Sequence, residues 1–237
     1  MDPSRYTILP IAPPPRTQAL NTTTFCPPPL NGTLTLPEIW DWHAEHSPKH
    51  PLFGFTDDEG GGRTVYWPEA VRAFHRAGRH ALSKLPKDAS HSVVAILAAC
   101  GALYVLWCPA TVTDHTCAPD TITYFTMEAG IVRAGHVMFP ISPRNSAPAV
   151  AHLLSKTNVA HVFVGAEPAL QDLVQASLKL MGGCTLPTVS TVPTFEELYT
   201  NESFELLPPP RLNLEDPAVI MHSSGMSLPY FPVGVEI

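Results

Sequence analysis

Apolar runs and segments with helical spacing alternate along most of this chain. From Pro68 to Leu85, five apolar positions recur at helical spacing and three arginines lie opposite them, which predicts an amphipathic helix. The branched apolar runs Val93–Ala98 and Val159–Val164 predict buried strands. Ser146 is expected to cap a helix. Helices are also expected at residues 36–46, 121–133, 146–156, 168–180 and 194–199, and strands at 137–141, 188–192 and 218–222.

Two short strand patterns near the N-terminus, Leu52–Phe55 and Thr64–Trp67, flank the sequence DDEGGGR, which is typical of a hairpin turn. A phosphate-binding loop at Gly60–Gly62 is the alternative, but it lacks the Gly-Lys-Ser/Thr ending and no helix pattern follows it directly. Elsewhere strands alternate with helices, so we predict an α/β fold with a mostly parallel sheet and flanking helices. Ligands of such sheets bind at the carboxyl ends of the strands.

Composition narrows the class of protein. Of 237 residues, 45% are apolar, which is typical of a folded chain, and 21 acidic against 14 basic residues give a net charge of -7. That negative charge argues against a basic surface that binds nucleic acid. The 5 cysteines lack the spacing of a disulfide scaffold or a zinc site, although Cys108, His115 and Cys117 could in principle meet on a metal. No metal ligand is therefore predicted, and a reducing, cytoplasmic location is favoured.

Two segments bear on membrane and partner binding. Residues 1–32 are rich in proline and are expected to form a flexible leader, since proline favours the polyproline II conformation and lacks an amide donor. The apolar run Val93–Ala110 reaches the lower length limit of a membrane-spanning helix. Because basic clusters and paired aromatic anchors are missing from its flanks, we favour a buried strand at its start and expect no membrane partner.

The strand expected at 218–222 runs into the most chemically suggestive string of the chain, MHSSGMS. A serine-hydrolase elbow around Ser223 would need glycine where Met221 stands, and no acid and histidine follow in the usual order. A phosphate-binding loop fits better, because small residues let backbone N–H groups approach phosphate and serine hydroxyls can donate to it. The predicted phosphate contacts are His222, Ser223, Ser224 and Gly225, and no catalytic residue is predicted.

Three strings occur in an order that carries a resemblance: RTVYWPEAV, then EAGIVRAGHVMFPISPRNSAPAVAHLLSKTNVAHVFV, then DPAVIMHSSG. Together they resemble the N-terminal half of the adenylate-forming superfamily, and RAGHVMFPISPRNS is most similar to the fungal adenylate-forming reductases. The resemblance implies that residues 33–237 form an N-terminal AMP-dependent synthetase/ligase subdomain. It also implies ATP-dependent activation of a carboxylic acid to an acyl adenylate, with ATP and Mg²⁺ as cofactors and His222–Gly225 in the phosphate loop.

The chain departs from that family in two places. After Gly225 the family continues with Ser/Thr-Thr-Gly and then Pro-Lys, whereas no lysine follows Lys179 here, and the family's acyl pocket and C-terminal domain are missing. Residues 100–119 interrupt the pattern as an irregular insertion. We therefore expect a truncated fragment that is inactive by itself, with chaperones as possible partners because its sheet edge is uncovered. The alternative is a non-catalytic interaction or membrane-associated protein that uses the leader and the insertion.

Overall fold

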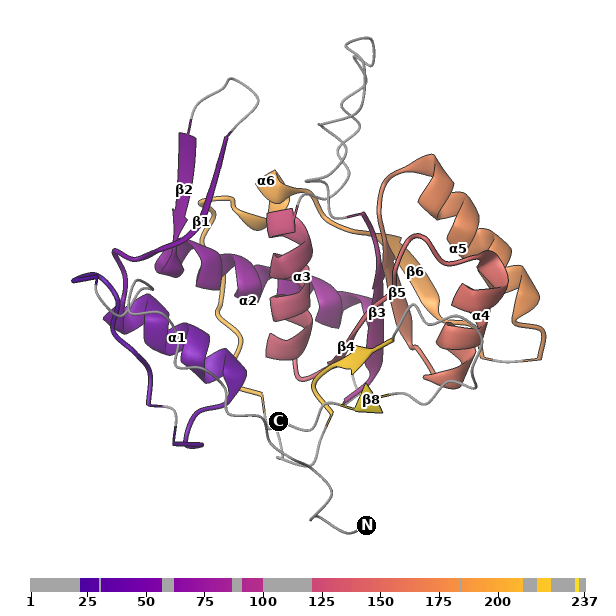
Figure 1. Ribbon diagram of the computed structural model, residues 1–237, viewed down its shortest axis with the longest axis horizontal. Helices are drawn as coiled ribbons and strands as arrows, with labels where there is room; N and C mark the ends of the chain where they lie inside the picture. The colour runs from indigo at the N-terminus through magenta and orange to yellow at the C-terminus, as the bar shows by residue number, and fades with distance from the viewer. Residues whose placement is uncertain are drawn as a thin grey trace, which may run out of the picture.

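The computed structural model describes residues 22–29, 31–56, 62–86, 91–99, 121–183, 185–210, 217–222 and 233–234. Its centre is a four-stranded sheet in the order β4-β3-β5-β6, and each neighbouring pair is parallel. The sheet strands are β3 (Val93–Leu97), β4 (Val137–Pro140), β5 (His161–Val164) and β6 (Thr188–Thr191). Helices α4 and α5 cover one face, and α2 and α3 cover the other (Figure 1). The predicted α/β fold with a parallel sheet is confirmed.

The helices lie close to their predicted bounds. They are α1 (Leu36–His46), α2 (Trp67–Lys84), α3 (Thr121–Arg133), α4 (Ala147–Lys156), α5 (Pro168–Leu180) and α6 (Phe195–Leu198). Strands β1 (Pro51–Thr56) and β2 (Gly62–Tyr66) form the predicted antiparallel hairpin, and β7 (Ile220–Met221) pairs antiparallel with β8 (Val233–Gly234). Ser146 is the N-cap residue of α4, as predicted, although its side chain makes no capping hydrogen bond.

Strand β3 shows why its sequence has no polar position. Val94 and Ile96 pack into the core under α2 and α3, whereas Ala95 and Leu97 pack into the core under α4 and α5. All four side chains are completely buried, as expected of a central parallel strand covered on both faces. The first part of the apolar run is therefore a strand, as predicted. No helix within the described ranges is long and apolar enough to cross a membrane.

Helices α2 and α3 approach each other closely where two glycines meet. A Cβ atom on Gly78 would lie 2.9 Å from the carbonyl oxygen of Gly130, and one on Gly130 would lie 2.7 Å from the amide nitrogen of Gly78. Any side chain at either position would separate the two backbones. These glycines therefore allow the backbones of α2 and α3 to pack at a short distance.

Part of the predicted leader contacts the domain. The ring of Phe25 stacks on His43 of α1 with a centroid distance of 5.1 Å. The amide of Cys26 donates to the Ser47 hydroxyl at 2.9 Å, just after α1 ends. Residues 1–21 and the predicted insertion at 100–119 lie outside the described residues, so the flexible leader and the insertion stay predictions.

A buried histidine joins the inner strand β5 to the edge strand β6. His161 on β5 lies 2.6 Å from the Thr188 hydroxyl through Nδ1 and 2.8 Å from the Ser190 hydroxyl through Nε2, both on β6. Its side chain is completely enclosed, and burial, with smaller contributions from Lys84 and His80, lowers its pKa to about 4. The folded protein therefore holds this ring neutral over the physiological pH range.

Candidate functional site

The candidate site lies where β7 joins the free edge of the central sheet. The amide of Met138 on β4 donates to the carbonyl of Ala218 at 3.0 Å, and Met138 forms a parallel bridge with Val219. The chain thus runs alongside β4 in the parallel direction before it reaches His222. Because parallel strands end at the same edge of a sheet, the predicted loop begins at the carboxyl end of β4.

One hydrogen bond connects the two strand ends. The amide of Ser142, which follows β4, donates to Nε2 of His222 at 3.2 Å. A ring nitrogen that accepts this bond carries no proton, so the neutral imidazole has its proton on Nδ1. The His222 ring also makes an edge contact with Phe139, with centroids 6.1 Å apart. The structure thus fixes the first residue of the predicted loop to the turn that follows β4.

That turn has its own hydrogen bonds. The amide of Asn145 donates to the Ser142 carbonyl at 3.2 Å, and the amide of Arg144 lies 3.3 Å from the Ser142 hydroxyl. Pro143 lies within the same turn, where its fixed φ angle limits the backbone. The Ser142 amide is therefore held by a rigid turn while it contacts His222.

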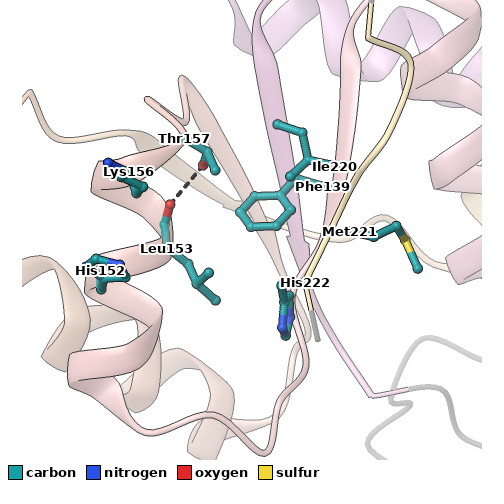
Figure 2. A pocket seen from close by; sticks show the side chains of 8 residues that line it. All are labelled: Phe139, His152, Leu153, Lys156, Thr157, Ile220, Met221 and His222. Atoms are coloured by element: carbon teal, nitrogen blue, oxygen red, sulfur yellow. Dashed lines mark hydrogen bonds between the residues drawn. The ribbon is translucent and has the colours of Figure 1, made fainter. Parts of the chain in front are cut away.

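A small cavity lies between α4 and this edge, with room for about one water molecule at about 20 Å³. Leu153 points from α4 toward Phe139 and His222, whereas His152 and Lys156 point away from them (Figure 2). His152 is exposed, in agreement with the core or surface role expected for it. The cavity is lined by Phe139, His152, Leu153, Lys156, Thr157, Ile220, Met221 and His222. The cavity is too small for a nucleotide, so it serves as packing space behind the strand end.

The structure places one of the four predicted phosphate contacts. His222 is described and half-buried, whereas Ser223, Ser224 and Gly225 lie outside the described residues, so their role stays a prediction. Within the described ranges, no group of three His, Cys, Asp or Glu side chains could hold a metal ion. The contact of His222 with Ser142 was not predicted from the sequence. The sequence did predict strands that end at residues 141 and 222. It gave no indication that these two strands lie next to each other in the sheet.

Comparison with known proteins identifies the class. The profile of the family described as AMP-binding enzyme matches residues 115–226. Adenylate-forming reductase Nps10 of Heterobasidion annosum is 40% identical over 226 residues, which cover 92% of this chain and 19% of Nps10. The chain belongs to the AMP-binding, adenylate-forming enzymes, as its sequence motifs predicted.

A second relative supports the same assignment. Adenylate-forming reductase Nps11 of Serpula lacrymans var. lacrymans (strain S7.9) is 31% identical over 209 residues, covering 84% of this chain and 17% of Nps11. The chain thus spans less than a fifth of the length of either fungal relative. Neither relative supports the alternative of a non-catalytic interaction or membrane-associated protein.

Solved structures show the same fold. A putative long-chain-fatty-acid CoA ligase from Rhodopseudomonas palustris CGA009 superimposes with a TM-score of 0.55 at 16% identity, over 81% of this chain and 42% of the ligase. The nonribosomal peptide synthetase FmoA3, solved with AMPPNP bound, gives a TM-score of 0.51 at 17% identity, over 79% of this chain and 16% of the synthetase. These likenesses place the parallel sheet and its helices in the adenylate-forming fold.

Proposed function

We propose that this chain supplies the first part of an enzyme that activates a carboxylic acid with ATP, including the start of its phosphate-binding loop. In that reaction a carboxylate oxygen forms a bond to the α-phosphorus of ATP, the bond from the α-phosphorus to the β-bridging oxygen breaks, and pyrophosphate leaves. The observation that supports the proposal is the hydrogen bond between the Ser142 amide and His222, the residue that leads into the proposed loop, at the carboxyl end of the parallel strand β4.

The residues of the loop fit the binding of phosphate. Ser223 and Ser224 offer hydroxyl donors, and Gly225 leaves room for backbone N–H groups to approach an anion. His222 is already bonded through Nε2, so its part is to anchor the loop at its first residue. Mg²⁺ would arrive bound to the phosphates of ATP, because this ion keeps most of its water ligands and pairs readily with phosphate oxygens.

The substrate is a carboxylic acid, and the name of the fungal relatives favours an acid whose adenylate is then reduced. The aligned stretch is less than a fifth of each relative, and the family resemblance implies that the acyl pocket follows it in the sequence. We therefore propose the reaction type without naming an acid. The nucleotide is ATP in this proposal, and the cellular compartment is the cytoplasm, as cysteine usage favours.

The 237-residue chain by itself is expected to show no carboxylate-dependent exchange of pyrophosphate into ATP. No lysine follows Lys179 in these 237 residues, and the chain aligns with less than a fifth of each relative. Positioning and charge stabilisation of ATP and acid need groups from both sides of the reacting phosphorus. The purified chain should match a no-enzyme control across a panel of aryl and acyl acids. Acid-dependent exchange above that control would contradict the proposal.

A chimera tests whether this segment is competent in a complete enzyme. Residues 22–225 of this chain would replace the Nps10 residues that align with them, in two versions that contain or lack residues 100–119. We expect acid-dependent exchange in at least one version, with intact Nps10 as the positive control. Two folded chimeras that show no exchange, while Nps10 is active, would overturn the proposal.

A further inference from the structure

Residues 200–210, here called the strap, connect α6 to the segment that enters β7. They contain neither helix nor strand, and they cross α2 on the way from α6 toward the sheet edge (Figure 1). An extended segment of this kind does not form hydrogen bonds between its own backbone N–H and C=O groups. Side chains from the rest of the domain therefore bind these groups and hold the segment in place. The strap also ends in three consecutive prolines, which lack amide donors and limit its flexibility.

The first half of the strap is held by arginines of α2 that bind backbone carbonyls. Arg76 donates to the carbonyl of Glu202 at 2.8 Å and to that of Leu198, where α6 ends, and Arg79 donates to the carbonyl of Glu205 at 3.1 Å. The Arg76 guanidinium also lies over the Phe204 ring, 4.4 Å from its centroid. The arginine face of α2, predicted only as the polar side of an amphipathic helix, is thus a docking face within the protein.

Leu207 is the best-fixed residue of the strap, because both of its backbone groups are bonded to side chains. Its amide donates to Nδ1 of His75 at 2.9 Å, and its carbonyl accepts from Arg133 at 3.4 Å. Its side chain lies against Gly78, where an added Cβ would come within 2.7 Å of Leu207 Cδ1. Residues from α2 and α3 therefore hold one point of the strap from both sides.

Asp41 of α1 ties these two side chains together. Its carboxylate accepts from Arg133 at 2.6 Å through Oδ2 and lies 3.7 Å from Nε2 of His75 through Oδ1. His75 and Arg133 are each only 3% exposed. Burial alone would raise the pKa of Asp41, but the favourable interactions of its carboxylate with His75 and Arg133 outweigh burial and lower it. The carboxylate therefore stays ionised and balances the buried guanidinium.

The far end of the strap reaches the start of β4. A Cβ atom on Gly135 would lie 3.3 Å from Cβ of Pro210, so the last proline passes beside the turn that leads into β4. Further along the chain, the carbonyl of Ala218 accepts the amide of Met138 on that strand. Fixing Leu207 therefore helps to hold Pro210 beside the turn that leads into β4, the strand with which Ala218 pairs.

We propose that Asp41, His75 and Arg133 form a positioning site for the strap, which keeps β7 on the edge of β4 and His222 beside Ser142. The three residues bind no substrate themselves. They act through Leu207, whose two backbone groups they hold. The functional meaning of the site rests on the proposed role of His222–Gly225 in phosphate binding, but its structural effect can be measured without any nucleotide.

Amide hydrogen exchange on the full 237-residue chain tests this site. Leu207→Pro removes the amide that His75 accepts and leaves Asp41, His75 and Arg133 unchanged. We expect the Met138 amide, which bonds to Ala218, to exchange at least about tenfold faster, because the strand edge opens locally. The reference amides are those of Gly165 and Val192, which bond within the central sheet, and they should keep their wild-type rates.

Matched variants separate positioning from general destabilisation. Leu206→Pro places proline one residue earlier, where the side chain is 55% exposed, and should leave the Met138 amide at its wild-type rate. Asp41→Asn should act like Leu207→Pro, since it removes the charge that balances Arg133. Equal acceleration of the edge and reference amides, or an unchanged Met138 amide in Leu207→Pro, would overturn the positioning site. Neither result depends on whether the chimera exchanges pyrophosphate.

Discussion

Gly130→Ala is expected to lower the free energy of unfolding by about 3 kcal/mol, which is a large effect for one added methyl group. Helix propensity alone would favour alanine by about 1 kcal/mol in the interior of a helix. The added Cβ would overlap Cβ of Ala77 and would lie 2.7 Å from the backbone nitrogen of Gly78. Backbone atoms of α2 cannot yield as a flexible side chain would, so the two helices must separate.

Gly182→Ala is the matched control, because no atom lies within 4 Å of a Cβ built on Gly182. It should change the free energy of unfolding by less than about 1 kcal/mol. Urea denaturation of the wild type, Gly130→Ala and Gly182→Ala, at one pH and temperature, measures the three free energies of unfolding. Equal stability of the two variants would show that α2 and α3 do not meet through Gly78 and Gly130 as described.

The protein is expected to lose stability as the pH falls from about 6.5 to about 4, in part because of His161. Its pKa is about 4 in the folded state and 6.5 in the unfolded chain, so between these values only the unfolded state binds the proton. Stability attributable to this group is therefore complete above pH 6.5 and declines as the pH falls. Its contribution over that window is roughly 2 kcal/mol, after allowance for solvent screening.

The comparison that isolates His161 is the pH slope of the unfolding free energy. His161→Gln keeps a side chain that can bond to the Thr188 or Ser190 hydroxyl but does not titrate, so the slope between pH 4 and 6.5 should become shallower. His152→Gln, at an exposed histidine of α4, should keep the wild-type slope. A slope in His161→Gln that equals the wild-type slope would show that this ring is not held neutral.

Much of the fold could be predicted because local chemistry and tertiary structure agree. Helix α5 occupies the predicted residues, since Pro168 suits a first turn and Gly182–Gly183 follow its end. Strand β3 could be recognised because an apolar run such as Val93–Ala98 is typical of a central strand that is covered on both faces. The close crossing at Gly78 and Gly130 could not be predicted, because an isolated glycine in a helical pattern does not say which backbone approaches it.

The site was predictable only in part for a related reason. The strand that leads to His222 was visible as an apolar run, and the rule for parallel sheets placed its end near a ligand. The strand that pairs with this run could not be identified from the sequence. That strand is β4, which lies about eighty residues before β7 in the chain. The docking of the strap depends on pairs still farther apart, such as Arg76 and Glu202. Contacts of this length are set by topology, and one sequence carries no direct signal for them.

The rate of pyrophosphate exchange into ATP by the chimera and its loop variants tests the phosphate-binding role most directly. Ser224→Ala removes a hydroxyl donor and Gly225→Val blocks the approach of the backbone, whereas His152→Ala alters an exposed side chain that points away from His222. We predict that both loop variants exchange at least about tenfold more slowly at low ATP, since hydrogen bonds to charged groups contribute about 1.5–3 kcal/mol, while His152→Ala matches the parent chimera. Loop variants that exchange at the parent rate would contradict a phosphate-binding role for residues 222–225.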